Sequence, residues 1–493
     1  MPQRSKGENG DHNEYSVFGA RRTAEETPIV QIDAIEGLRT RSDVEVFTGT
    51  GGSAEVTTTN GGREFKCSTG TSIGGYGLIR SQKYNRYRPG QGAIIRYSAR
   101  FPTPGTNLSR IAAGGVNVGV ELSFGYNNTD FGILHRTGGQ LNINRLTISS
   151  AASGAETATI TLNGTEFTVD LTSGTTAHNA HEIAQETYTG YVAFQNGSTV
   201  TFIAQNVGEQ TGTFSFSSST AAASFSELNS GNAVTDNFVK QSEWNIDKMD
   251  GRGPSLMNLD PSKGNVYQID YQSGYGQIVY CIEEPGRGYV VPVHRLQFTN
   301  VNDGPNLSLP SLRIGWFAAS LGSSGTNLEL YGTKAAGLVD GPIIPFRNPE
   351  AISNSKTSIG TSLTPVLSIR VRADFNNDIN VSQILPQNAF IAVDGTKPAR
   401  ATVILNGVFT GEPNWTYIDE SDSVVEYDTA ATGVSIGAGS TRLGVIALGK
   451  SDGRSINLKS ENVTVQRTQV ITIAVQSTSG TTDSTVSLDW IEE

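Results

Sequence analysis

Short runs in which apolar and polar residues alternate, separated by turns that contain Gly or Asn, recur along most of this 493-residue chain. In GAIIRYSARF, from Ile95 to Phe101, apolar side chains occupy every second position, with two arginines and a serine between them. A period of two is the spacing of side chains on one face of a β-strand. Asn163-Gly164 and Asn196-Gly197 each separate two such runs, and Asn-Gly in that position is the strongest short-range hairpin signal. The pattern predicts short antiparallel strands.

The composition agrees with such a chain. It has 56 Gly residues, and only 17% of its residues are charged. Val, Ile, Leu, Phe and Tyr recur in alternating runs, which a disordered chain lacks, and long segments of helix-forming residues are few. The fold class that we expect is all-β, with multiple β-sandwich (jelly-roll-like) domains and a small inserted ββαββ module.

The chain divides by sequence texture into an interrupted domain, its insert and a C-terminal domain. Residues 1–43 are predicted to be a polar N-terminal arm and docking segment. Residues 44–145 and 233–346 are predicted to form one β-sandwich, which residues 146–232 interrupt as the inserted module. Residues 347–493 are predicted to form a C-terminal β-sandwich of ordinary size.

The insert contains the clearest helical segment of the sequence. TTAHNAHEIAQET places Ala177, Ala180 and Ile183 at helical spacing between the two Asn-Gly hairpins, which gives the order ββαββ. The Pro-rich stretch 342–354 is expected to be a joint before the C-terminal sandwich.

Charge and hydropathy argue against several functional classes. The net charge of −11 does not supply the summed positive field that attracts nucleic acid, so we expect no direct nucleic-acid binding. Because no run of about 18 apolar residues occurs, we expect no membrane insertion. The opening MPQRSKGENGDHNEYSVFG lacks the apolar core of a signal peptide, which favours synthesis in the cytoplasm without export.

One stretch is rich in both positive charge and aromatic rings. RSQKYNRYRPGQGAIIRYSARF, residues 80–101, holds six Arg or Lys residues and four Tyr or Phe residues. The candidate subunit-contact or ligand surface comprises Arg80, Lys83, Tyr84, Arg86, Tyr87, Arg88, Arg96 and Arg100. Such side chains bind phosphates, glycans or an acidic partner. The favoured alternative is a Pro89-Gly90 turn leading into an amphipathic strand, with long side chains that cover a sheet or meet carboxylates of a neighbouring subunit.

Motifs of known catalytic or metal sites are weak. Ser72 fits G-x-S-x-G, but turn and strand residues follow it rather than a helix. His178 and His181 lie one helical turn apart without a third ligand, while DKMDGRG and DFNNDIN are typical of Asx-rich turns. The two cysteines are too few for a disulfide scaffold or a four-Cys zinc site, and we expect buried thiols. We therefore expect no enzymatic activity, no cofactor and no bound metal.

Several long segments together resemble a known class of viral proteins. They are SVFGARRTAEETPIVQ, SQKYNRYRPGQGAIIRYSARF, FGILHRTGGQLNI, EWNIDKMDGRGPSLMNLDPSKGNVYQIDYQ, VPVHRLQFTN and the C-terminal STVSLDWIEE. The chain resembles the virion structural proteins, capsid-associated or tail-associated, of tailed bacteriophages and other large DNA viruses. This resemblance carries no functional residues with it.

The resemblance implies a non-enzymatic protein of the virion, made in the host cytoplasm. Its implied role is an oligomeric capsid-associated component that decorates the head, occupies a vertex or forms a head appendage. The implied partners are further copies of the chain, with a trimer as the expected oligomer, and other virion proteins such as major capsid or tail proteins. On this view the 80–101 stretch meets a carboxylate-rich face of another copy.

Two other functions stay open from sequence. A tail or fibre protein that binds host-surface glycans has the same composition and the same kind of outward β-domains. A tail-borne glycan depolymerase is a third hypothesis, but it is usually marked by β-helix repeats or a cluster of carboxylates, and neither is evident.

Overall fold

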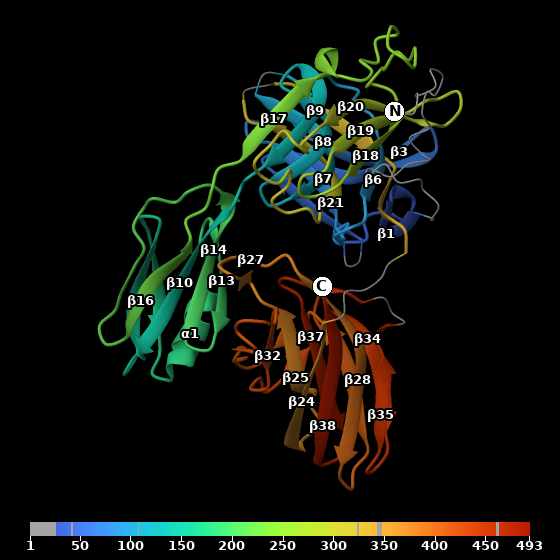
Figure 1. Ribbon diagram of the computed structural model, residues 1–493. Coiled ribbons are helices and arrows are strands. Elements are labelled where there is room, and N and C mark those ends of the chain that lie inside the picture. Colours follow the sequence, from blue (N-terminus) through green and yellow to red (C-terminus); the bar gives the residue numbers. More distant parts are fainter. Residues whose placement is uncertain (1–25, 41–42, 107, 323–324, 343–347, 460–462) are drawn as a thin grey trace. The chain divides into compact units, whose positions relative to one another are not determined.

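The computed structural model describes residues 26–40, 43–106, 108–322, 325–342, 348–459 and 463–493 (Figure 1). Strands make up most of the described elements, and α1 (Thr176–Gln185) is the one α-helix among them. Short 3₁₀ helices lie at η2 (Ala34–Glu36) and η3 (Gln241–Glu243). None of these helices is long and apolar enough to cross a membrane. The predicted all-β fold with multiple sandwiches is confirmed.

The chain forms two compact units. The first takes its described residues from Met1–Gly139 and Ala233–Ile344, and the second from Gln140–Asn232 and Pro345–Glu493. Most of the predicted N-terminal arm, residues 1–25, lies outside the described residues.

Two antiparallel sheets share the core of the first unit. The six-stranded sheet runs, in spatial order, β1 (Glu26–Asp33), β23 (Lys334–Asp340), β6 (Ala93–Ala99), β18 (Asn265–Tyr271), β19 (Ile278–Glu283) and β20 (Val290–Leu296). The seven-stranded sheet runs β17 (Thr235–Lys240), β9 (Asp130–Thr137), β8 (Val120–Asn127), β7 (Ser109–Asn117), β21 (Arg313–Ser320), β5 (Tyr76–Ser81) and β2 (Val44–Gly49). A smaller sheet runs β22 (Glu329–Gly332), β4 (Gly62–Ser68) and β3 (Ser53–Thr59).

Strand β6 shows how the alternating pattern builds this core. Ile95, Tyr97 and Ala99 are at most 2% exposed and belong to the main apolar cluster, whereas Arg96 between them is partly exposed. The predicted alternation is confirmed. The predicted turn before the strand is also present, and Gly90 there has φ +85°, a value that glycine adopts without steric cost.

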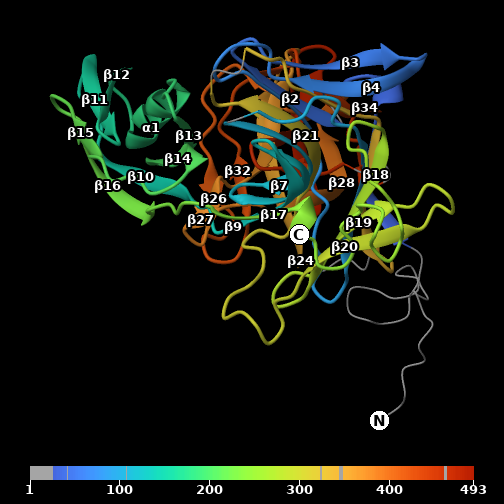
Figure 2. The ribbon, with the colours of Figure 1, turned by 90° about the horizontal axis from the view of Figure 1, so that it is seen from above.

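The insert is built from two facing sheets and the helix. One sheet runs β13 (Tyr191–Asn196), β14 (Thr199–Val207), β10 (Leu141–Ser150) and β16 (Ala222–Asn229), and the other runs β12 (Thr165–Leu171), β11 (Glu156–Leu162) and β15 (Ser215–Ser217). Figure 2 shows α1 between the β11–β12 hairpin and strands β13 and β14. Both predicted Asn-Gly turns join their hairpins, and Asn163 (φ +49°) and Gly164 (φ +82°) have the left-handed conformations that a type I′ turn requires.

A second sandwich completes the second unit (Figure 1). One sheet runs β24 (Asn348–Ile359), β38 (Thr482–Glu492), β28 (Gln383–Asp394) and β35 (Gly453–Asn457), with β36 (Val465–Gln466) paired to β28. The other runs β31 (Thr416–Tyr417), β32 (Val425–Asp428), β25 (Thr364–Val371), β37 (Val470–Ser477), β29 (Ala399–Leu405) and β34 (Thr441–Leu448). Two short hairpins pair β26 (Asp374–Phe375) with β27 (Asp378–Ile379), and β30 (Val408–Phe409) with β33 (Val434–Ser435).

The joint predicted over residues 342–354 is wrong from Asn348 onward, where β24 begins. Pro349 is compatible with this strand because β24 lies at the edge of its sheet, where a missing N–H need not break a second ladder.

Candidate functional site

The basic stretch 80–101 contributes to both large sheets of the first unit. Arg80 lies on β5 of the seven-stranded sheet, and Arg96 lies on β6 of the six-stranded sheet. Lys83, Arg86 and Arg88 lie in the segment between these strands, and Arg88 is only 7% exposed. The eight predicted residues therefore belong to different layers of one sandwich.

Several of these side chains have partners within the same unit. Arg80 Nε donates to Glu45 Oε2 at 2.9 Å. Arg100 donates to both carboxylate oxygens of Glu64, at 2.9 and 2.8 Å, and its guanidinium lies 3.7 Å from the ring centroid of Tyr331. The hydrogen bond from Arg100 lowers the pKa of Glu64 below its ordinary value.

Four further residues of the stretch also have contacts within the unit. Tyr84 lies 4.4 Å under the Arg313 guanidinium, and Tyr87 stacks on Tyr271 with ring centroids 6.1 Å apart. Arg96 Nε donates to Gln268 Oε1 at 2.7 Å, and the backbone carbonyl of Lys83 accepts a hydrogen bond from Ser81. These contacts account for much of the stretch as structure, and its role as a subunit-contact or ligand surface stays a prediction.

The weak sequence motifs have structural explanations. Ser72 lies in the loop between β4 and β5, not at a strand-to-helix turn. Asp247 accepts hydrogen bonds from the backbone N–H groups of Met249 and Ser255, as an Asx-rich turn does. Asn376 (φ +51°) and Asn377 (φ +61°) form the tight turn between β26 and β27.

Metal-binding and thiol chemistry find little support. Among the residues described, no three His, Cys, Asp or Glu side chains gather in a way that could hold a metal ion. Cys67 and Cys281 are buried thiols that are not joined in a disulfide, as predicted, and burial raises the pKa of Cys67 to about 12. His178 lies between two carboxylates, with its Nδ1 2.8 Å from Glu412 Oε2 and its Nε2 3.2 Å from Glu182 Oε1.

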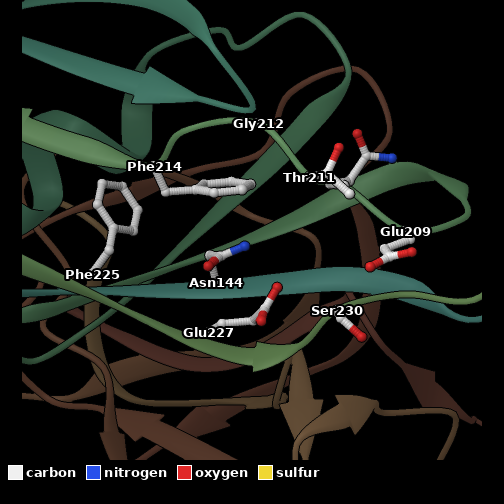
Figure 3. Close-up of a pocket in the computed structure, with 9 residues that line it drawn as sticks. Asn144, Glu209, Thr211, Gly212, Phe214, Phe225, Glu227 and Ser230 are labelled. Carbon is white, nitrogen blue, oxygen red and sulfur yellow. The ribbon is translucent and has the colours of Figure 1, made fainter.

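A hollow of about 450 Å³ opens on the insert (Figure 3). It is lined by Asn144, Glu209, Gln210, Thr211, Gly212, Phe214, Phe225, Glu227 and Ser230. Figure 3 shows the rings of Phe214 and Phe225 at one end, Glu209 and Thr211 at the other, and Asn144 and Glu227 between them.

The hollow forms where the inward face of one sheet changes from apolar to polar. On β10, Leu146 is buried in the core of the insert, and Asn144, two residues earlier, faces the same side of the sheet. On β16, Phe225 lies opposite Leu146, and Glu227 lies opposite Asn144. Because alternate residues face the same side of a strand, an apolar cross-strand pair is followed by a polar one at the mouth of the core.

Hydrogen bonds between neighbouring side chains hold this polar row in place. Asn144 Nδ2 donates to Asn142 Oδ1 at 2.8 Å, and Asn142 Nδ2 donates to Glu227 Oε1 at 3.3 Å. Asn142 Nδ2 also lies 3.0 Å from the carbonyl oxygen of Asn229. The floor of the hollow is thus fixed by a strand and by amides that are themselves fully buried.

The loop between β14 and β15 closes the other side of the hollow. Its Gly212 N–H donates to Asn163 Oδ1 at 2.7 Å, and Asn163 Nδ2 donates to Gln210 Oε1 at 2.5 Å. At its start, Gly208 lies so close to Gly231 that a Cβ at Gly231 would come within 2.3 Å of the Gly208 carbonyl oxygen. The Asn of the first hairpin turn therefore also positions the wall of the hollow.

The aromatic end is a small cluster. The ring centroids of Phe214 and Phe225 lie 6.0 Å apart at 61° to one another, and those of Phe225 and Phe202 lie 5.8 Å apart. Phe202 is fully buried, whereas Phe214 and Phe225 are half-buried. The core of the insert thus continues into the hollow as two rings that keep part of their surface accessible.

Four polar side chains of the hollow have few partners among the described residues. Among the hydrogen bonds of the described residues, none involves the side chain of Glu209, Thr211 or Ser230, and Glu227 receives only the 3.3 Å contact from Asn142. Glu209, Thr211, Glu227 and Ser230 are all exposed. The arrangement can therefore accept hydrogen bonds from a small polar ligand that also contacts an aromatic wall.

Sequence reasoning missed this hollow, although a signal was present. In LNINRLTIS, Asn142 and Asn144 fall at the positions that continue the inward phase of Leu146 and Ile148. Amide side chains at inward-facing positions of a strand need hydrogen-bond partners. Two Asn residues at such positions therefore indicate that this end of the sheet carries a polar cluster.

Two other hollows lie outside the insert. One, of about 490 Å³, lies beside β9 and β17 and is lined in part by His135, Asn237, Phe298 and Asp303. His135 is buried there with its Nε2 2.7 Å from the carbonyl oxygen of Asn306, and burial lowers its pKa. The other, of about 510 Å³, lies over β28, β35 and β38, where Phe390 is 49% exposed.

Comparison with known proteins leaves the chain without an assigned family. No protein-family model matches it, and no curated protein matches it in sequence. Among solved structures it is similar to the cellulose-induced protein Cip1, at 9% identity and a TM-score of 0.29 over 62% of this chain and 96% of that one. It is also similar to the exoplasmic/lumenal domain of VIP36 in its Ca2+/Man3GlcNAc-bound form, at 10% identity and 0.24 over 66% and 93%.

A third similar structure is the triple jelly roll turret protein of an archaeal virus, at 7% identity and a TM-score of 0.17 over 92% of this chain and 89% of that one. At TM-scores this low, the three likenesses assign neither a family nor a ligand to this chain.

Proposed function

We propose that this protein is a non-enzymatic, saccharide-binding component of a virion and that the hollow on the insert is its binding site. One observation carries the proposal: two partly accessible rings, Phe214 and Phe225, share a hollow with carboxylate and hydroxyl groups that lack strong partners among the described residues. A sugar ring has an apolar C–H face that packs on an aromatic ring and hydroxyl groups that need acceptors.

The geometry favours binding over hydrolysis. Both glutamates of the hollow, Glu209 and Glu227, are exposed to solvent. A glycosidase needs one carboxylic acid that stays protonated near neutral pH, which enzymes achieve by burying it in an apolar setting. Neither glutamate has such a setting, so we assign both the role of hydrogen-bond acceptors.

The virion setting rests on the resemblance of the long sequence segments, together with the all-β construction. A shallow, solvent-open hollow supports weak binding by a single copy. Several copies on one particle would bind a glycan-covered surface far more tightly, because binding of each further copy becomes intramolecular. We therefore propose a homo-oligomer, with a trimer as the expected form, attached to other virion proteins.

Binding of the full-length chain to an array of host-type glycans tests the proposal. The variant Phe214→Leu removes one ring of the hollow, and we expect it to reduce binding by about tenfold. The matched control is Phe216→Leu, since Phe216 is half-buried in the same module but does not line the hollow.

Three outcomes would contradict the proposal. Wild-type protein that binds no glycan contradicts it directly, as do equal losses in the two Phe variants. Release of shorter saccharides from a bound glycan would make the protein an enzyme. Antibody labelling of purified particles tests the virion setting separately, because protein that is absent from particles cannot be a virion component.

A further inference from the structure

We infer that the hollow on the insert selects saccharides that carry a free amino group, and that it disfavours saccharides that carry a carboxylate. The inference rests on the proposed function and adds the class of ligand. Its first basis is the charge of the lining, because Glu209 and Glu227 both line the hollow and none of the nine lining residues is Lys, Arg or His.

The two carboxylates reach the hollow from different parts of the insert. Glu227 lies on β16, and Glu209 lies in the loop between β14 and β15. Figure 3 shows both side chains directed toward the space between that loop and the sheet. A ligand in this space therefore approaches negative charge from two directions.

No cation of the described chain pairs with these carboxylates. Neither Glu209 nor Glu227 takes part in an ion pair among the described residues, and the one hydrogen bond to Glu227 comes from the neutral amide of Asn142. A cation bound in the hollow would be attracted by both carboxylates.

The arginine next to the lining residue Asn144 does not neutralise the two carboxylates. Arg145 follows Asn144 on β10, so its side chain starts on the opposite face of the sheet. There its Nη2 lies 2.9 Å from Asp374 Oδ2 of the C-terminal sandwich. The fold thus uses the available positive charge elsewhere and leaves the hollow negative.

An amino sugar matches each part of this lining. The ammonium group of the sugar supplies three donors for the carboxylates, and the sugar hydroxyl groups can hydrogen-bond Thr211, Ser230 or Asn144. Its C–H face packs on Phe214 and Phe225. An N-acetylated sugar keeps the C–H face and the hydroxyl groups but lacks the positive charge. A uronic acid brings a carboxylate close to those of Glu209 and Glu227.

The experiment compares three ligands of one size on the full-length chain: an oligomer of glucosamine, its N-acetylated counterpart and an oligomer of galacturonic acid. Isothermal titration at about pH 6 keeps the amino groups protonated. We expect the glucosamine oligomer to bind about tenfold more tightly than the N-acetylated one. The galacturonate oligomer should not bind, and added salt should weaken the first interaction most.

Charge-neutral variants locate the effect. The double variant Glu209→Gln and Glu227→Gln should lower the preference for glucosamine over its N-acetylated form to within about twofold, since the remaining hydrogen bonds are neutral. Glu166→Gln is the matched control: Glu166 is exposed on β12 of the same module and does not line the hollow. It should leave the preference unchanged.

The outcomes separate this inference from the proposed function. Equal binding of the amino and N-acetyl oligomers, lost in both cases with Phe214→Leu, overturns the amino-group selection and leaves saccharide binding intact. Binding of galacturonate, or an unchanged preference in the double variant, also overturns the selection. No binding of any saccharide overturns both. Displacement of the glucosamine oligomer by an equal concentration of ethylammonium would show a general cation site and would likewise overturn the inference.

Discussion

The 80–101 stretch of the first unit and the hollow of the insert differ in whether their charged side chains have partners within the protein. The stretch carries six Arg or Lys residues, yet Arg80 and Arg100 each have a carboxylate partner and an aromatic ring beside the guanidinium. The hollow carries two glutamates without a cationic partner among the described residues. The number of charged residues in a segment therefore predicts a binding site less well than the number of polar side chains that the fold leaves without hydrogen-bond or ion-pair partners.

The difference has a physical cause. A ligand that competes for Arg100 must replace two hydrogen bonds from Glu64 and a ring contact with Tyr331, and that exchange yields little net free energy. The side chains of Glu209, Thr211 and Ser230 are exposed, and a ligand that binds them displaces no side-chain partner among the described residues. The comparison predicts that changes in the stretch alter stability, whereas changes in the hollow alter binding.

The largest effect is expected from the inward side of the stretch. Tyr97 is 2% exposed, stacks on Tyr267 with ring centroids 5.7 Å apart and donates its hydroxyl hydrogen to the carbonyl oxygen of Ala113. Tyr97→Ala should lower the free energy of unfolding of the first unit by about 3–5 kcal/mol, because it leaves a cavity and removes the hydrogen bond from the Tyr97 hydroxyl to Ala113. Denaturant unfolding measures this change. Tyr289→Ala is the control, since Tyr289 is 46% exposed, and an equal loss there would contradict the assignment of Tyr97 to the core.

Loss of the ion pair between Glu64 on β4 and Arg100, the residue after β6, should cost less stability and should depend on pH. Glu64→Gln removes the charge that Arg100 faces, and we expect a loss of about 1–2 kcal/mol at neutral pH. The pKa of Glu64 is lowered in the folded protein, chiefly by its hydrogen bond from Arg100. The stabilisation is therefore present above the ordinary Glu pKa and is lost as the pH falls through the lower folded value.

Unfolding of wild type and Glu64→Gln at several pH values tests this prediction. The two stabilities should converge as the pH falls. Glu55→Gln is the matched control, because Glu55 lies on the neighbouring strand β3, is 53% exposed and lies 3.8 Å from Lys66. A gap between wild type and Glu64→Gln that stays constant down to low pH would refute the ion-pair explanation.

Much of the fold could be predicted from sequence because its signals are local. The alternation in β6, the Asn163-Gly164 turn and the helix α1 each depend on residues within about ten positions of one another. The joint at 342–354 failed because Pro and Asn usually end strands, whereas edge position, which permits Pro349, is a property of the sheet and not of the segment.

The candidate site could not be predicted in the same way. Its row of Asn144 and Glu227 forms through a cross-strand register between residues that are 83 positions apart. The partners of Arg80 and Arg100, Glu45 and Glu64, are likewise distant in sequence. Residue types alone cannot show whether a charge is paired. The sequence therefore indicated the basic stretch as a candidate site and gave no comparable indication of the hollow.

A smaller effect is expected within the second unit. His178 of the insert hydrogen-bonds Glu412 of the C-terminal sandwich and lies beside Glu182 and Thr172. The hydrogen bond with Glu412 is the main cause that raises the pKa of His178. The contact therefore stabilises the folded protein at a pH below the ordinary His pKa, and this contribution is lost as the pH rises through the higher folded value.

The variant Glu412→Gln should reduce the stability of the second unit by less than about 1 kcal/mol at pH 5.5 and by almost nothing at pH 8.5, because the pair is partly exposed. Thermal unfolding at the two pH values measures the difference. Glu186→Gln, an exposed position at the end of α1, should show no pH-dependent change. A loss in Glu412→Gln that is larger at pH 8.5 would reverse the sign and exclude this account.

The smallest effect on stability is expected at Arg96, and it addresses the predicted subunit contact. Arg96 donates to Gln268 and lies 3.6 Å from Glu26, and 36% of its side chain is exposed. Arg96→Gln should change the free energy of unfolding by no more than about 0.5 kcal/mol, as surface substitutions usually do. The mass of the assembly, measured by light scattering, is then a separate readout. If the variant has a lower mass at unchanged stability, Arg96 contacts another copy and the subunit-contact prediction holds for this residue. If mass and stability are both unchanged, the side chain only covers its own sheet, and the contrast between the self-paired stretch and the open hollow becomes sharper.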